Sequence, residues 1–192
     1  MKVRFAIAAV LLVAGAAAAA PVKYTIDPDH TYPSFEADHF GGLSTWRGKF
    51  TKTSGTIVYD KEAGSGTLDI TIDPASVDTG HEKLNDHVRT GPDMLDAKKY
   101  PTATYTGKLA KFVNGAPTEV DGTLTLHGVS KPVKLKIDHF GCRPHPMKQG
   151  KEVCGANATA DLNRADFGID WGQSYGFKMD VKLAIQVEAL TD

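Results

Sequence analysis

The segment Phe177–Glu188 decides the fold class, and it reads FKMDVKLAIQVE. Apolar residues occupy every second position from Phe177 to Val187, and most of the residues between them are charged or polar. Side chains of a β-strand alternate between two faces, so a period of two predicts a long strand with one buried face and one face in water. A helix would instead repeat its apolar residues every three to four positions.

The same alternation occurs in six further stretches of the chain. They cover residues 23–27, 34–39, 46–51, 67–73, 123–127 and 133–138. Turn-forming residues lie between strands, at Gly41-Gly42, 61–66, 114–117 and 127–132. Strands with one wet and one dry face form antiparallel sheets, and closing such a sheet removes its exposed edges. The sequence therefore predicts an all-β fold, an eight-stranded antiparallel barrel built from hairpins in chain order.

One segment interrupts the alternation, and we predict a short helical excursion there, at about residues 78–98. Asp78 or Thr79 is suited to cap a helix, and apolar residues four positions apart follow on one face. Pro92 suits the first turn of a second short helix. We expect this excursion to lie across the barrel wall or one of its ends.

The first twenty residues have the composition of a secretory signal peptide. Of these residues 17 are apolar, Lys2 and Arg4 stand near the start, and a run of alanines ends the segment at Ala20. We predict a cleaved signal peptide over residues 1–20, one domain over 21–192 and a periplasmic location. An uncleaved anchor helix is the alternative. No later stretch approaches 18 consecutive apolar residues.

The charge of the remaining chain excludes two classes of partner. Residues 21–192 contain 20 Lys and Arg against 23 Asp and Glu. A nucleic-acid-binding protein needs a basic face, and a protein held on anionic lipid needs a polybasic stripe. We therefore expect no nucleic acid partner and no stable membrane insertion.

Two cysteines, Cys142 and Cys154, flank a loop that contains two prolines and a glycine. In an oxidising compartment such a loop is readily closed by a disulfide. The alternative is a metal site that adds His145, with or without His139, to the two thiols. Zinc sites favour paired ligands at short spacing, which this segment lacks, so we expect a disulfide and no metal.

The interior of an eight-stranded barrel is either filled by side chains or leaves room for one small ligand. The inward positions here mix large rings with small residues, so the sequence leaves both outcomes open. The rings are Phe35, Trp46, Phe50, Tyr105 and Phe177, and the small residues are Ala37, Gly48, Ala103, Ala156, Ala158 and Ala160. His39 shares the phase of Phe35 and is either a structural histidine or a polar contact for a ligand head group.

Two catalytic motifs are matched only in part. Residues 172–176 read GQSYG and match the nucleophile elbow, but they precede an alternating strand in an all-β chain. His81 and Glu82 begin a zinc protease motif, whose second histidine comes at 87 and off the first histidine's helical face. We interpret both as structural segments.

Six blocks of the sequence, in the right order, resemble the YceI-like family of exported polyisoprenoid-binding proteins. The blocks are Tyr24–Thr31, Phe35–Gly41, Gly48–Ile57, Val88–Pro101, Gly122–Val133 and Asn163–Gly168. Two positions depart from the family pattern: Met94-Leu95 stands where a pair of aromatics is frequent, and Pro33 stands where an aliphatic residue is usual.

The resemblance implies an extended lipocalin-like barrel with a channel for a long isoprenoid, and it implies no catalytic residues and no cofactor. We expect an exported carrier or store for an isoprenoid quinone or a polyprenyl phosphate, compatible with a homodimer. The expected lining comprises Phe35, Ala37, His39, Trp46, Phe50, Leu84, Val88, Met94, Tyr105, Leu124, Phe167 and Trp171. Two alternatives are a hydrolase or isomerase that uses His39 or His30 on a lipid, and a packed barrel that binds another protein.

Overall fold

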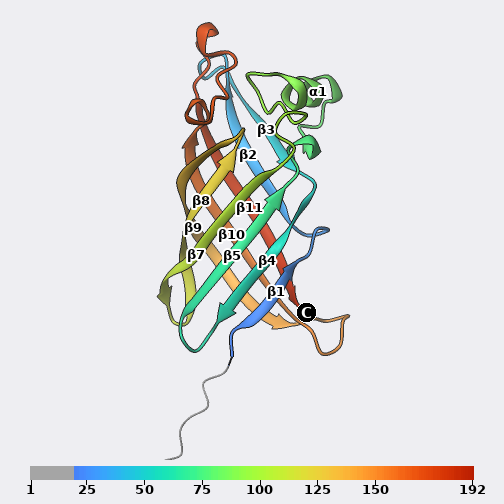
Figure 1. The fold of residues 1–192 in the computed structure, drawn as a ribbon, viewed down its shortest axis with the longest axis vertical. Coiled ribbons are helices and arrows are strands. Elements are labelled where there is room, and N and C mark those ends of the chain that lie inside the picture. The colour runs from blue at the N-terminus through green and yellow to red at the C-terminus, as the bar shows by residue number, and fades with distance from the viewer. Residues whose placement is uncertain (1–19) are drawn as a thin grey trace, which may run out of the picture.

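A computed structural model describes residues 20–192 as one sheet wrapped into a barrel (Figure 1). The signal peptide predicted over residues 1–20 lies outside the described residues except for Ala20. The strands are β1 (Val22–Ile26), β2 (Tyr32–His39), β3 (Ser44–Phe50), β4 (Thr53–Asp60), β5 (Ser65–Ile72), β6 (Val77–Asp78), β7 (Ala103–Val113), β8 (Ala116–Leu126), β9 (Val129–Pro144), β10 (Glu152–Asn163) and β11 (Asp180–Thr191). The helices are α1 (Glu82–Thr90) and three 3-10 helices, η1 (Pro74–Ser76), η2 (Arg164–Phe167) and η3 (Gln173–Tyr175).

The barrel closes because β11 pairs with β1 at the end of a sheet ordered β1-β4-β5-β7-β8-β9-β10-β11. The remaining strands are β2, β3 and β6. They continue β1, β4 and β5 along the barrel axis. Residues 189–191 of β11 pair with β1, and residues 181–186 pair with β2. In the same way β3 extends β4, and β6 extends β5. All of these pairings are antiparallel, so the predicted eight-stranded antiparallel barrel is confirmed.

The hairpin turns form at the predicted turn sequences. Asn114 and Gly115 join β7 to β8 with φ values of 51° and 79°. His127 and Gly128 join β8 to β9 with φ values of 52° and 76°. Two successive left-handed residues make the turn whose twist matches a tight β-hairpin, which is why Asn-Gly and His-Gly pairs occur there.

Helix α1 lies at one end of the barrel, the upper end in Figure 1. Its N-cap is His81, so the caps predicted at Asp78 and Thr79 are wrong. Asp78 belongs to the two-residue strand β6. Thr79 bonds the buried Asn85 of the helix, whose Oδ1 accepts from the Thr79 amide at 2.7 Å and from its hydroxyl at 2.8 Å. Thr79, which precedes the helix, is therefore held by the side chain of Asn85, which belongs to the helix itself.

The second helix predicted at Pro92 does not form, and residues 92–100 make consecutive turns instead. The chain leaves α1 at Gly91, which is extended, and folds back so that the Leu95 amide donates to the Val88 carbonyl at 3.0 Å. This return buries Met94 and Leu95, which are 9% and 7% exposed. Burial of these two side chains against the core thus determines the conformation of residues 92–100.

The strand β11 begins three residues later than the alternation of the sequence. Phe177 and Met179 precede it and are buried in the loop that follows η3. Gly176 has a φ of 83°, and the Phe177 amide donates to the Gly172 carbonyl at 3.1 Å. The chain therefore turns at Gly176 before it enters the sheet.

A disulfide joins Cys142 of β9 to Cys154 of β10, which are paired directly across the two strands. The predicted disulfide is confirmed, and with both sulfurs in this bond neither is a thiolate metal ligand. His145 instead shapes the β9–β10 loop, where its Nδ1 accepts from the amides of Met147 and Lys148 at 3.1 and 2.9 Å.

Helices are few in the part of the chain that the structure describes. Within residues 20–192, none is both long enough and apolar enough to cross a membrane.

Candidate functional site

The exposure of side chains along β11 shows that the barrel is hollow. Its inward residues Val181 and Ala189, near the two ends, are 9% and 1% exposed. Leu183, Ile185 and Val187, which lie between them, are only half-buried. In a filled barrel the middle of a strand would be the most buried part, because interiors are packed to high density. The reverse order means that the middle of the barrel encloses space and both ends are covered.

This space is a cavity of about 300 Å³, lined almost entirely by aliphatic and aromatic side chains. Its volume lies at the low end of the roughly 300–1,000 Å³ typical of ligand pockets. Large rings gather on β2 and β3, where Phe35 and Phe50 lie 5.9 Å apart. A side chain at Gly48 would come within 2.5 Å of the Phe35 ring, so glycine makes room for the ring. The hollow removes the basis for a packed-barrel interaction module.

Nine of the twelve residues expected to line the interior do line this cavity. They are Phe35, Ala37, Trp46, Phe50, Val88, Met94, Tyr105, Leu124 and Trp171. Their part in binding a ligand stays a prediction.

His39, Leu84 and Phe167 do not belong to the lining, so the expectation for these three is wrong. The His39 ring stacks on Trp46 at 4.5 Å and meets Phe177 edge-on at 5.3 Å, so other rings separate it from the space. Leu84 packs partly buried against the main core cluster. Phe167 is 2% exposed and is itself part of that core.

The expected set also missed residues that line the cavity. They include Tyr24, Tyr59, Ile70, Leu135, Phe140 and Ile185. Ile70, Leu135 and Ile185 belong to alternating stretches that were recognised, and extending the inward phase along each strand would have found them. Tyr24 and Tyr59 come together only because β1 pairs with β4.

The hydroxyl groups around the cavity are already hydrogen-bonded within the protein. The Tyr105 hydroxyl donates to the Val133 carbonyl at 2.7 Å, and burial raises the pKa of this phenol. The protein also supplies a hydrogen-bond partner to the hydroxyl groups of Tyr24, Thr31, Ser34, Tyr59 and Thr79. The exception among the described lining hydroxyls is Thr53, whose Oγ1 is buried without a partner. A ligand in this space is therefore held by apolar contact.

Two charged side chains, Asp38 and Arg164, are part of the lining. Asp38 Oδ2 accepts from the Gly41 amide at 2.8 Å and from the Lys178 amide at 2.9 Å. These bonds, first of all that from Lys178, hold the pKa of the Asp38 carboxyl below its ordinary value. Asp38 thereby ties the β2–β3 turn to the loop that precedes β11.

Arg164 fastens another loop of the same region. Its Nη1 donates to the Ile169 carbonyl at 3.0 Å and its Nη2 to the Trp171 carbonyl at 2.8 Å. Burial lowers the pKa of Arg164, and the nearby carboxylates of Asp170, Asp38 and Asp93 act in the opposite direction. The guanidinium thus sits in a field of carboxylates and holds Trp171 against the cavity.

We call the end of the barrel near α1 the loop end, because loops cover it. The residues that cover it belong to segments 79–102 and 164–179. Val88, Met94 and Leu95 are buried there, and Trp171 packs edge-on against Phe177 at 5.3 Å. The Trp171 amide donates to the Asp93 carbonyl at 3.1 Å, which joins the two segments.

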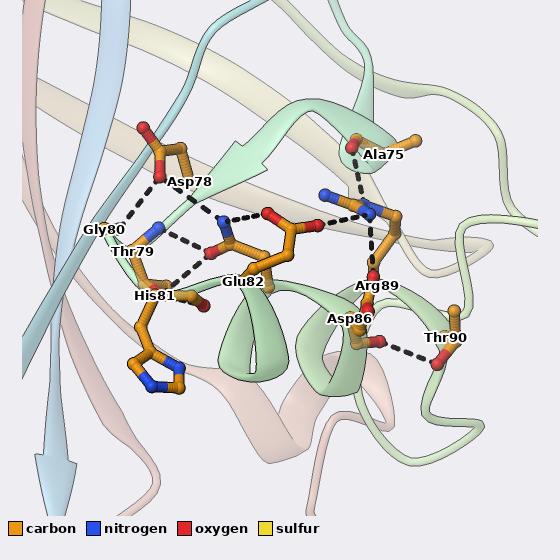
Figure 2. Close-up of polar contacts among 10 residues, drawn as sticks. Ala75, Asp78, Thr79, Gly80, His81, Glu82, Asp86, Arg89 and Thr90 are labelled. Atoms are coloured by element: carbon orange, nitrogen blue, oxygen red, sulfur yellow. Dashed lines mark hydrogen bonds and ion pairs between the residues drawn. The ribbon is translucent and has the colours of Figure 1, made fainter.

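Polar contacts hold α1 on the barrel at the loop end (Figure 2). Arg89 Nε donates to the Ala75 carbonyl at 2.9 Å, and its Nη1 lies 3.0 Å from an Asp86 oxygen. Arg89 is therefore engaged by the protein itself.

We call the opposite end the strand end, because residues of the strands themselves close it. Tyr24 of β1 is 1% exposed and Tyr59 of β4 is 4% exposed. The Tyr24 hydroxyl donates to Glu152 Oε1 at 2.5 Å, and Lys61 Nζ lies 2.7 Å from the same oxygen. These bonds lower the pKa of Glu152, with Lys61 the largest cause.

The described lining residues form no arrangement typical of an enzyme. They include no histidine. His30 does pair with Asp27, at 3.0 Å, but its side chain is 59% exposed and lies outside the lining. Ser174 is exposed in η3, between left-handed Gly172 and Gly176, and not on a strand-to-helix elbow. An enclosed space with this apolar lining is suited to hold an apolar ligand.

Comparisons with known proteins agree with this geometry. The profile of the YceI-like domain family matches residues 24–189. A UPF0312 protein of Pseudomonas aeruginosa is 34% identical over 188 residues, which cover 96% of this chain and 94% of that protein. The crystal structure of the Campylobacter jejuni YceI protein matches with a TM-score of 0.64 and 31% identity, over 78% of this chain and 86% of that one.

A more distant structure shares the fold. It is described as a polyisoprenoid binding domain from Saccharophagus degradans implicated in plant cell wall breakdown. It matches with a TM-score of 0.61 and 18% identity, over 89% of this chain and 99% of that one.

Proposed function

The chain belongs to the YceI-like domain family, and from this premise we propose that it binds a long-chain polyisoprenoid lipid in the barrel cavity. The lipid is of the isoprenoid quinone or polyprenyl phosphate class, and the protein carries, stores or sequesters it. The observation that carries the proposal is the apolar cavity along the barrel, whose lining hydroxyls are nearly all hydrogen-bonded within the protein.

The energetics of such a site favour a hydrocarbon tail. Each buried methylene contributes about 0.8 kcal/mol, so a five-carbon isoprene unit contributes up to roughly 4 kcal/mol before costs. Ordering the tail and losing its translational freedom offset a large part of this gain. Several units are enough for tight binding without a specific polar contact.

The tail enters first and the head group stays at the loop end. Asp38 and Arg164, the charged residues of the lining, both lie there. Loops and short helices can move aside on the timescale of ligand exchange, whereas the strand end would have to break strand pairing.

Export completes the proposal. Residues 1–20 direct the chain to the periplasm and are removed there, and in that oxidising compartment the Cys142–Cys154 disulfide is maintained. The mass of the protein isolated from a periplasmic extract tests this step. We expect the mass of a protein that lacks the signal peptide of residues 1–20. Full-length protein in the membrane fraction would contradict export with cleavage.

Native mass spectrometry of the purified mature protein tests the proposed function. We expect an added mass of several hundred daltons that extraction with organic solvent removes. Mass spectrometry of the extract should identify it as a prenyl lipid. A ligand-free protein that takes up no added prenyl lipid would overturn the proposal.

A further inference from the structure

We propose that the strand end acts as a stop that limits the length of prenyl tail the cavity accepts, with Tyr59 as the residue that sets the limit. This inference rests on the proposed lipid binding and adds a selection by tail length. Its basis is the way in which Tyr24 and Tyr59 form the floor of the cavity.

Both tyrosine rings line the cavity and are held by their hydroxyl groups from the far side. The Tyr59 hydroxyl donates to the Gly115 carbonyl, in the β7–β8 turn, at 2.6 Å. The Tyr24 hydroxyl donates to Glu152 at 2.5 Å. A tail that pushed either ring aside would break a hydrogen bond and expose a buried ring, so the floor resists displacement.

A second layer of groups supports the floor. Phe140 meets the Tyr59 ring edge-on at 5.5 Å, and Phe112 stacks on it at 6.3 Å. Phe140 lines the cavity, whereas Phe112 is not part of the lining. The Cys142–Cys154 disulfide ties β9 to β10 two residues beyond Phe140, so this wall has little freedom to open.

The depth of the cavity gives the expected limit. Ala189 at the strand end and Val181 near the loop end are eight residues apart on β11. At about 3.4 Å per residue and a strand tilt of about 40°, this separation spans roughly 20 Å along the barrel axis. An isoprene unit adds four chain carbons, or about 5 Å when extended with bonds of about 1.5 Å. The cavity therefore encloses at most about four units.

The test measures binding of a series of uncharged prenols with two to eight isoprene units, by quenching of Trp46 and Trp171 fluorescence. For the unaltered protein we expect affinity to rise about tenfold with each unit up to about four, because each enclosed unit buries apolar surface. Beyond that length we expect less than about a twofold change per unit, because further units stay outside.

Variants of the floor separate the stop from general packing. Tyr59→Ala should extend the rise by about one unit, because removing the ring deepens the cavity. Tyr59→Phe keeps the ring but loses its hydrogen bond to Gly115, so its limit should lie between those of the unaltered protein and Tyr59→Ala. Phe112→Ala changes no lining residue and should keep the limit. Phe140→Ala removes a lining ring and should also raise the limit, which guards against poor folding of Tyr59→Ala.

Two results would overturn the stop alone: affinity that keeps rising through eight units, or a limit that stays unchanged in folded Tyr59→Ala and Phe140→Ala. Failure of every prenol to bind would overturn the proposed function, and the stop with it.

Discussion

The two ends of the barrel cover the same cavity in different ways. At the strand end, Tyr24, Tyr59 and Ala189 belong to paired strands and are 1–4% exposed. At the loop end, segments 79–102 and 164–179 also bury apolar residues but are attached through a few side-chain and loop hydrogen bonds. Opening the strand end requires breaking a ladder of backbone bonds, whereas opening the loop end requires breaking local ones. Both ends are therefore buried, and they differ in the kind of bonds that must break before they open.

The largest expected effect tests the cavity between the two ends. Ala156 of β10 lines the cavity and is half-buried, and its neighbour Asn157 is exposed on the outer face. Ala156→Trp should fill the hollow and weaken prenyl lipid binding by at least about 100-fold, because ligand and indole compete for one space. Asn157→Trp adds the same ring outside and should bind as before. Equal binding by both variants, measured by lipid uptake, would contradict the site.

The next prediction concerns the stability of the strand end. Replacing both cysteines by serine, Cys142→Ser with Cys154→Ser, should lower the free energy of unfolding by about 2–3 kcal/mol, because the cross-link closes a loop in the unfolded chain. Urea denaturation of the two proteins measures it. An unchanged urea midpoint would show that the disulfide does not stabilise the folded protein.

At the loop end we expect a kinetic effect with little loss of stability. Arg164→Ala removes the bonds to the carbonyls of Ile169 and Trp171, so the loop that carries Trp171 should open more easily. Lipid release, followed by transfer to acceptor vesicles, should quicken by about tenfold, which is about 1.4 kcal/mol in the barrier. Lys61→Ala, which removes a charge at the strand end, is the matched control and should leave release unchanged. Faster release in both variants would contradict the difference between the ends.

The pH dependence of stability sharpens the comparison at the strand end. Hydrogen bonds from Lys61 and Tyr24 lower the pKa of Glu152 in the folded protein. Its stabilising contribution is therefore present above the carboxyl's ordinary pKa and is lost as pH falls through the lower, folded value. Thermal unfolding of the unaltered protein and Glu152→Gln, from neutral to acid pH, should give melting curves that differ at pH 7 and converge in acid. A difference in melting temperature that stays constant with pH would mean that the charge of Glu152 does not contribute to stability.

The smallest effect concerns the orphaned hydroxyl of Thr53, which is 4% exposed and has no hydrogen-bond partner. Thr53→Val replaces this hydroxyl by a methyl of similar size and should raise the free energy of unfolding by about 1 kcal/mol. Thr31→Val is the control, since the Thr31 hydroxyl bonds the Glu188 carbonyl and its loss should destabilise. Destabilisation by both changes, seen in urea denaturation, would show that Thr53 has a partner.

Particular residues show where prediction from sequence stopped. The alternation over Asp180–Val187 predicted both the strand and its inward face, because the side-chain direction in a strand depends on position alone. The alternation also extended to Phe177, where a left-handed Gly176 turns the chain, so periodicity continued beyond the strand. His39 had the right phase and was still wrong as a lining residue, because Trp46 and Phe177 stand between it and the cavity.

The sequence alone determined an antiparallel barrel, its hairpin turns and the pairing of its two cysteines, since these follow from side-chain direction and short loops. Tertiary structure alone decided that the barrel is hollow, which end is closed by strands and which by loops. A cavity depends on how far apart opposite walls stand, and on which rings from distant strands meet. Tyr24 and Tyr59 became a floor only through pairing of β1 with β4, a contact that no local pattern encodes.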